Sequence, residues 1–209
     1  MNLERLISSY QSQPISHQVL VSLLKDYKRP NDKIYELIKQ ENLISLKRGL
    51  YLWNSEILPE PFSVANVLYG PSYVSSESAL SYHGLIPEQV FSIVSMTLKN
   101  SKNFNNAFGN FEYIKLQPPY YAFGIQQVKL RENQFSLMAT AEKAILDKVA
   151  TTSGIIFRRV ESARVFLLEN MRMDEDQLKS LNTKEMASWI FDAPKKESLE
   201  FVIKAIEEL

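Results

Sequence analysis

Apolar positions at the start of the chain recur with the spacing of helices. Three stretches carry an apolar residue every three or four positions, and each follows a residue type that commonly caps a helix. We therefore predict three helices, capped by Asn2, by Ser16 and by Asn31 or Asp32. Their apolar stripes are Leu3, Leu6, Ile7 and Tyr10 in the first, Val19, Leu20, Leu23, Leu24 and Tyr27 in the second, and Ile34, Leu37 and Ile38 in the third.

The pattern changes to strand-like alternation after Asn42. Residues 43–48 alternate between two faces, Gly49 permits a bend, and residues 50–53 read as a returning strand. This predicts a two-stranded hairpin with Lys47 and Arg48 near its turn. Three helices followed by such a hairpin predict a winged helix-turn-helix domain over residues 1–57, with the hairpin as its wing.

The rest of the chain, residues 58–209, predicts a mixed α/β domain that ends in helices. Pro59 and Pro61 mark a linker, and residues 61–96 contain no lysine or arginine, as expected of segments buried between other elements. The fold class is therefore α+β. The predicted helices are 62–69, 75–83 with Gly84 as its stop, 141–149, 160–170, 177–181, 184–191 and 196–209. The predicted strands are 90–97, 111–116, 121–130, which forms either one strand or a hairpin pair, and 135–138.

Composition narrows the function classes. The chain has 209 residues, of which 45% are hydrophobic, with no cysteine and two histidines. Disulfides and thiolate metal sites are excluded, and we expect no metal site and no cofactor. There is no run of about 18 apolar residues and no secretory profile at the N-terminus, so we expect a cytoplasmic protein without a membrane partner.

Charge is balanced over the whole chain but not along it. The net charge is zero, with 24 basic and 24 acidic residues. Residues 25–48 hold seven basic and four acidic residues, and residues 97–160 hold nine and four, whereas residues 161–209 hold seven and eleven. A basic front with an acidic tail is compatible with local phosphate contact despite the neutral total.

Two pairs of cations are the main candidates for contact with the DNA backbone. Lys47 and Arg48 lie near the predicted wing turn, although charged hairpin tips are often simply solvated. Lys28 and Arg29 precede the third helix, where cations and backbone N–H groups can meet one phosphate. The full set of predicted DNA-binding residues is Lys28, Arg29, Lys33, Tyr35, Lys39, Gln40, Lys47 and Arg48.

The outward face of the third helix is a weaker candidate. Tyr35, Lys39 and Gln40 have side chains suited to base edges in a groove. Asp32 and Glu36 share that face, and their carboxylates repel a phosphate backbone.

Two groups of residues raise an enzymatic alternative. His83 follows Ser78 by five positions, which leaves their side chains about 140° apart on a helix, so we expect His83 to donate a hydrogen bond that fixes the Gly84 turn. Glu142, Lys143 and Asp147 are read instead as a helix cap and an i,i+4 ion pair. We therefore expect no catalytic activity.

An aromatic set raises the further alternative of base stacking beside Lys115, Lys129 and Arg131. The simpler interpretation is that most of these rings form the core of a sheet. The set is Phe104, Phe108, Phe111, Tyr113, Tyr120, Tyr121 and Phe123.

Three blocks in order carry a family resemblance: residues 47–51 (Lys-Arg-Gly-Leu-Tyr), residues 75–85 and residues 138–147. Over roughly residues 15–170 the chain resembles the AbiEi-type abortive-infection antitoxins. The resemblance implies a winged helix that binds operator repeats and represses its own operon. It also implies a C-terminal α/β domain that opposes a nucleotidyltransferase toxin, and it places Lys47 and Arg48 in the phosphate-contacting region. The acidic outer face of the third helix differs from the strongly basic face of a helix that recognises DNA.

Two functions from different classes follow. The first is a DNA-binding antitoxin and autorepressor whose partners are the operator of its own operon and a nucleotidyltransferase toxin. The alternative is a non-DNA protein-interaction module that acts through the α/β domain. For toxin neutralisation, the candidate surface is Lys99, Lys102, Lys115, Lys129, Arg131, Arg158 and Arg159.

Overall fold

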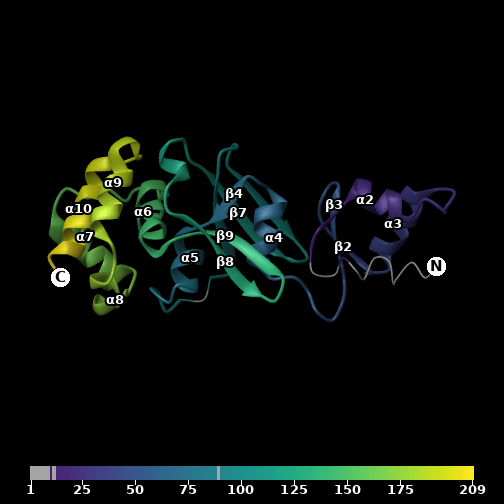
Figure 1. Cartoon of the computed structure of the whole chain (residues 1–209), viewed down its shortest axis with the longest axis horizontal. Helices are drawn as coiled ribbons and strands as arrows, with labels where there is room; N and C mark the ends of the chain where they lie inside the picture. The colour runs from purple at the N-terminus through teal and green to yellow at the C-terminus, as the bar shows by residue number, and fades with distance from the viewer. Residues whose placement is uncertain (1–9, 11–12, 89) are drawn as a thin grey trace.

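A computed structural model describes residue 10, residues 13–88 and residues 90–209. The fold is α+β, as predicted, with a small sheet and two helices near the N-terminus, a larger sheet in the middle, and a group of helices at the C-terminal end (Figure 1). The predicted first helix, capped by Asn2, lies outside the described residues. No helix among those described is both long enough and apolar enough to cross a membrane.

The N-terminal sheet has three antiparallel strands in the order β1-β3-β2. Its strands are β1 (Ile15–Ser16), β2 (Leu43–Lys47) and β3 (Leu50–Trp53), and the helices α2 (His17–Leu23) and α3 (Pro30–Lys39) lie between β1 and β2 in the chain. The predicted hairpin is confirmed. The two-residue strand β1 is too short to leave a pattern in the sequence, and the sequence analysis missed it.

Two helix boundaries near the N-terminus differ from those predicted. Ser16 caps α2 as predicted, accepting a hydrogen bond from the backbone N of Val19 at 3.3 Å. That helix ends at Leu23 rather than continuing to Tyr27, whose side chain is 42% exposed. The cap of α3 is Arg29, not Asn31 or Asp32, because Pro30 has the fixed φ that suits the first helical position.

The larger sheet has six strands in the order β6-β7-β5-β4-β9-β8. Only β5 with β7 and β4 with β9 run parallel. Two strands were not predicted from the sequence: β4, which has three residues, and β6, an edge strand of mostly polar residues. The strands are β4 (Ser72–Val74), β5 (Ser92–Thr97), β6 (Lys102–Asn106), β7 (Gly109–Lys115), β8 (Ile125–Arg131) and β9 (Gln134–Ala139).

Residues 121–124, which the sequence analysis placed in a strand, belong to other structures. Tyr120–Ala122 form a 3-10 turn, and Gly124 has a φ of 62°. The strand β8 begins only after this break. A side chain at Gly124 would also collide with Lys143 and Trp189, because a Cβ there would lie 2.6 Å and 2.9 Å from their atoms.

Helices cover the larger sheet and extend beyond it. The helix α4 (Pro61–Leu68) contacts β4, β5 and β9, while α5 (Ser76–Tyr82) and α6 (Ala141–Thr151) pack against each other beside the sheet. The later helices form the C-terminal end of the molecule (Figure 1). They are α7 (Val160–Val165), continued by a π-helical turn at Phe166–Asn170, α8 (Glu175–Lys179), α9 (Thr183–Trp189), followed by a 3-10 turn at Ile190–Asp192, and α10 (Lys196–Glu207).

The described residues contain two hydrophobic clusters, and the hairpin contributes to both. The smaller cluster joins α2 and α3 to one side of the hairpin, through Leu43, Tyr51 and Trp53. Leu46, Leu50 and Leu52 belong instead to the larger cluster around the six-stranded sheet. The hairpin is therefore packed between the N-terminal helices and the rest of the molecule.

Candidate nucleic-acid interface

The first turn of α2 lies between the hairpin turn and the start of α3. The backbone N of His17 donates a hydrogen bond to the carbonyl of Gly49 at 2.9 Å. A surface pocket of about 440 Å³ is lined by His17, Gln18 and Val21 of α2 and by Pro30 and Asn31 of α3. The turn that carries Arg48 and the helix start that follows Arg29 therefore flank the same end of α2.

Lys28 and Arg29, ahead of α3, are both exposed. The guanidinium of Arg29 lies 3.6 Å from the carboxylate of Asp32, and these side chains are 84% and 70% exposed. Such an open ion pair contributes little and is readily exchanged for a contact with phosphate. Because Pro30 has no N–H, this helix start has one backbone donor fewer, and the cationic side chains add to those that remain.

On the outward face of α3, one carboxylate engages two of the predicted site residues. Glu36 accepts hydrogen bonds from Lys33 at 2.8 Å and from Gln40 at 3.0 Å. The hydrogen bond from Lys33 holds the pKa of Glu36 below its usual value. Tyr35, 71% exposed, and Lys39, also exposed, form none of the ion pairs found among the described residues. Of this face, Tyr35 and Lys39 are the side chains most available to DNA.

Lys47 and Arg48 are neighbours in sequence but have different surroundings. Arg48 is exposed. Lys47 is half-buried, and its ammonium donates a hydrogen bond to the backbone carbonyl of Leu68 at the end of α4. Burial, followed by the charges of Lys99 and Lys102, lowers the pKa of Lys47. Lys47 thus fastens the hairpin to α4, and the two cations are not an equivalent pair at the hairpin turn.

The seven basic residues considered for toxin neutralisation do not form one surface. Lys102 lies on β6 and Lys129 on β8, which are opposite edges of the six-stranded sheet. Lys99 donates a hydrogen bond to the carbonyl of Gly70, and Lys115 donates one to Asn100 at 3.3 Å. Arg131 forms an ion pair with Glu60. The set is dispersed because the order of the strands in the sheet separates its members, and the order of the strands in the sequence does not predict this arrangement.

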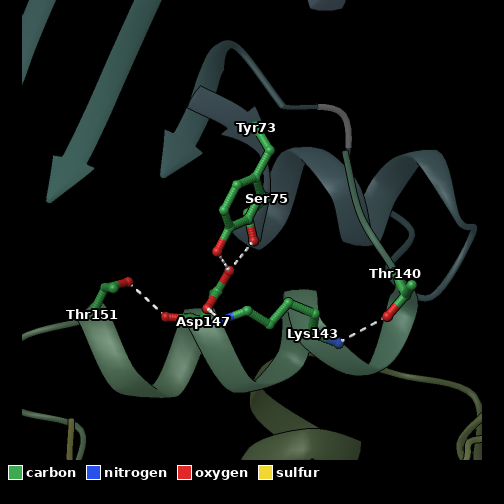
Figure 2. Close-up of polar contacts among 6 residues, drawn as sticks. All are labelled: Tyr73, Ser75, Thr140, Lys143, Asp147 and Thr151. Carbon is green, nitrogen blue, oxygen red and sulfur yellow. Dashed lines mark hydrogen bonds and ion pairs between the residues drawn. The ribbon is translucent and has the colours of Figure 1, made fainter. Parts of the chain in front are cut away.

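The motif at residues 138–147 forms a buried polar network (Figure 2). Lys143 and Asp147, both completely buried, form an ion pair of 2.6 Å. The other oxygen of Asp147 accepts hydrogen bonds from Tyr73 at 2.9 Å and Ser75 at 2.7 Å. The i,i+4 spacing predicted the Lys143–Asp147 ion pair on α6. Tyr73 and Ser75 lie more than 70 positions before Asp147 in the chain, so no local sequence pattern indicates that they bond it.

The low polarity around this network shifts its proton equilibria. Burial lowers the pKa of Lys143 even though Asp147 opposes this change. Burial, reinforced by the charge of Asp147, raises the pKa of Tyr73 and of Tyr120 well above their usual values. The ammonium of Lys143 lies 3.3 Å from the centroid of the Tyr120 ring. With every charge paired and no exposed surface, this group serves to join α6 to β4 and to the start of α5.

His83 and Glu142 both have structural contacts, but not the predicted ones. The Nε2 atom of His83 donates to the carbonyl of Ala139 at 2.8 Å, which links the end of α5 to β9 instead of fixing the Gly84 turn. Gly84, with a φ of 75°, does end the helix as predicted. Glu142 accepts a hydrogen bond from the backbone N of Asn182 at 3.2 Å, next to α9, rather than capping its own helix, which Thr140 caps.

The predicted aromatic set is mostly core. Phe111, Tyr113 and Tyr120 are at most 1% exposed, and the other four rings are partly buried against the same cluster. The interpretation of these rings as sheet core is confirmed. They are therefore not a platform for stacking bases.

A scan against protein-family models gave no match, and a search of curated proteins gave none either. Within the described part of the chain, no group of three or more His, Asp or Glu side chains is placed to hold a metal ion.

Proposed function

We propose that the protein is a DNA-binding antitoxin that represses its own operon. In this proposal residues 1–57 form a winged helix-turn-helix that contacts operator DNA, and residues 58–209 oppose a nucleotidyltransferase toxin. The toxin and the operon follow from the resemblance to AbiEi-type antitoxins, and the DNA contact also has support from geometry.

The observation that carries the proposal is the arrangement around the first turn of α2. A short strand, two helices and a hairpin follow in chain order, with β1 paired to β3. Exposed cations lie on both flanks of α2, with Lys28 and Arg29 on one and Arg48 on the other. Cations that converge on a duplex neutralise phosphates and release counterions.

The roles within this site are unequal. Lys28, Arg29 and Arg48 contact the backbone, since exposed cations can turn toward phosphates at little cost, and Arg29 gives up only its open ion pair with Asp32. Tyr35 and Lys39 contact base edges or further phosphates. Lys47 positions the hairpin by its bond to Leu68 and makes at most a minor direct contact.

The test is binding of the full-length chain to the DNA immediately upstream of its own reading frame, followed by fluorescence anisotropy. We expect Arg48→Ala to weaken binding about tenfold across different sequences, because loss of a phosphate contact carries no sequence preference. Lys184→Ala, which removes an exposed cation from α9, is the matched control and leaves affinity unchanged. Equal effects of the two substitutions would remove the hairpin turn from the mechanism.

The alternative, a protein-interaction module, is favoured by a specific observation. Phe91 is 90% exposed, and Phe135 and Leu137 on β9 are 48% and 47% exposed. Phe135 and Leu137, two positions apart on β9, lie on the same face of the sheet, and adjacent exposed apolar side chains of this kind are found at protein interfaces. Absence of any binding to the upstream DNA, with retained fold, would favour this second function.

A further inference from the structure

A cavity between the six-stranded sheet and the C-terminal helices lies away from the candidate DNA interface. Its volume is about 670 Å³, within the range of small-molecule sites. Strands β5 and β7 form one wall, and the start of α5 and the end of α6 form another. The residues at the end of the π-helical turn, Asn170 and Met171, close it. Turns of this kind often occur beside functional sites.

The sheet contributes an apolar floor with one carboxylate. Val94 of β5 and Glu112 of β7 are directly opposite each other in the parallel pair, and Ile114 follows on the same face. Tyr113 points to the other face, where its hydroxyl donates to the carbonyl of Ala65 in α4 at 2.6 Å. Glu112 is therefore directed to the cavity side by strand alternation.

Charge in the cavity is negative. Three carboxylates line it, from Glu77, Glu88 and Glu112, against one ammonium, from Lys148, and Arg172, outside the lining, forms an ion pair with Glu88. Lys148 forms an ion pair with Glu77 and so is already neutralised. Burial raises the pKa of Glu77, but hydrogen bonds from Lys148 and Ser76 outweigh burial and hold it below its usual value, so this carboxylate stays ionised.

The remaining two carboxylates have unused acceptor capacity. Glu88 forms an ion pair with Arg172 through one carboxylate oxygen, which accepts from the Arg172 Nε at 2.8 Å, while its other oxygen is buried and has no partner among the described residues. The carboxylate of Glu112 has neither an ion pair nor a hydrogen bond within the described part of the chain. A buried carboxylate oxygen without a donor is costly unless a ligand supplies one.

We propose that this cavity binds a small organic cation, whose ammonium or guanidinium group lies at Glu112 and Glu88 while its apolar part covers Val94 and Ile114. A guanidinium suits the site because its N–H groups are several and planar, so it can reach two carboxylates at once. Burying a hydrocarbon chain against the branched aliphatic side chains of this floor is favourable, and a metal ion has no such apolar part. This function is independent of DNA binding.

The test uses two probes of the same shape that differ in charge, butylguanidinium and butylurea, titrated calorimetrically into the full-length chain. We expect saturable binding of one butylguanidinium, with butylurea about tenfold weaker or undetected. Glu112→Gln, which keeps the shape and removes the charge, weakens butylguanidinium binding about tenfold. Glu132→Gln, in the exposed turn between β8 and β9, is the matched control and has no effect.

A second variant tests the site without altering the sheet. Ser153 lines the cavity and is exposed, so Ser153→Arg adds a competing cation at its rim. We expect this substitution to weaken butylguanidinium binding while the thermal unfolding midpoint of the unliganded protein changes little. Three results would each overturn the proposal: no binding of butylguanidinium, equal binding of the two probes, or wild-type affinity in both cavity variants.

Discussion

At the scale of single residues, neighbours in sequence can have unrelated roles. Sequence alone singled out both Lys47 and Arg48, because each is a cation near a turn. The partner of Lys47 is the carbonyl of Leu68, 21 positions away, and only the packing of the hairpin against α4 brings them together. A local pattern therefore identifies a candidate cation, but it does not tell whether tertiary packing has already engaged it.

The different roles of these two residues predict that Lys47→Ala mainly lowers stability, whereas Arg48→Ala mainly weakens DNA binding. We expect Lys47→Ala to lower the free energy of unfolding by about 1–3 kcal/mol, since it deletes a charge-assisted hydrogen bond and leaves a helix-end carbonyl unpaired. Arg48→Ala should leave it within about 0.5 kcal/mol. Urea unfolding followed by circular dichroism measures both, and equal stability of the two variants would refute the assignment of Lys47.

Buried tyrosines predict a loss of stability at alkaline pH. Burial raises the pKa of Tyr73, Tyr113 and Tyr120 in the folded state above the ordinary value of 10.0. The stabilisation from these groups is complete below pH 10 and decreases as pH rises above it, because only the unfolded chain then releases the protons. The lowered pKa of Lys143 acts in the opposite direction, and we expect the three tyrosines to outweigh it.

Tyr120→Phe isolates one of these contributions. The Tyr120 hydroxyl has no hydrogen-bond partner among the described residues, and the ring against Lys143 is retained. We expect stability near pH 7 to be unchanged or slightly higher, and the decrease above pH 10 to become shallower. Urea unfolding at a series of pH values gives both quantities, and an unchanged alkaline slope would contradict the role of Tyr120.

At the scale of elements, the sequence predicted well those helices within the described residues that have a clear apolar stripe, and the strands with strong alternation. What it missed were β1, β4 and β6, which are short or polar and exist because neighbouring strands pair with them. The side chain of Asn66 in α4 links this helix to the neighbouring strands β4 and β9. Its amide accepts from the backbone N of Leu137 at 2.7 Å and donates to the carbonyls of Leu137 and Ser72, each at 3.2 Å.

This bridging amide leads to a test of how α4 is attached. Asn66→Ala removes every contact of the amide at once, and we expect a loss of about 2–4 kcal/mol because backbone groups of β4 and β9 and the buried Ser136 hydroxyl lose a partner together. Asn105→Ala on the edge strand β6 is the matched control and should cost less than about 1 kcal/mol. Similar losses in chemical unfolding would show that Asn66 is not a structural link.

At the scale of the whole molecule, the hairpin couples two hydrophobic clusters. The sequence analysis placed a domain boundary between residues 57 and 58, which follows the composition shift at Pro59 and Pro61. Yet Leu46, Leu50 and Leu52 pack with the larger cluster, so the two parts share a structural element. Periodicity shows which face of a strand is apolar, but it does not show that opposite faces belong to different cores.

Shared packing predicts that the two clusters unfold together. Each contains one of the two tryptophans, Trp53 in the smaller and Trp189 in the larger. We expect the single-tryptophan variants Trp53→Phe and Trp189→Phe each to show a fluorescence transition that coincides with the loss of its own far-UV circular dichroism signal. Fluorescence of Trp53 that changes well before the loss of helix would instead indicate an independent N-terminal unit.

The central claim is that exposed cations around α2 neutralise the DNA backbone, and the salt dependence of binding tests it most directly. Affinity for the upstream DNA is measured by anisotropy over a series of salt concentrations, for the wild type and for Arg48→Ala. We expect the logarithm of the association constant to fall with the logarithm of salt with a slope of about −2 to −4, less steep by about one in the variant. A slope near zero, or one that Arg48→Ala leaves unchanged, would contradict the account.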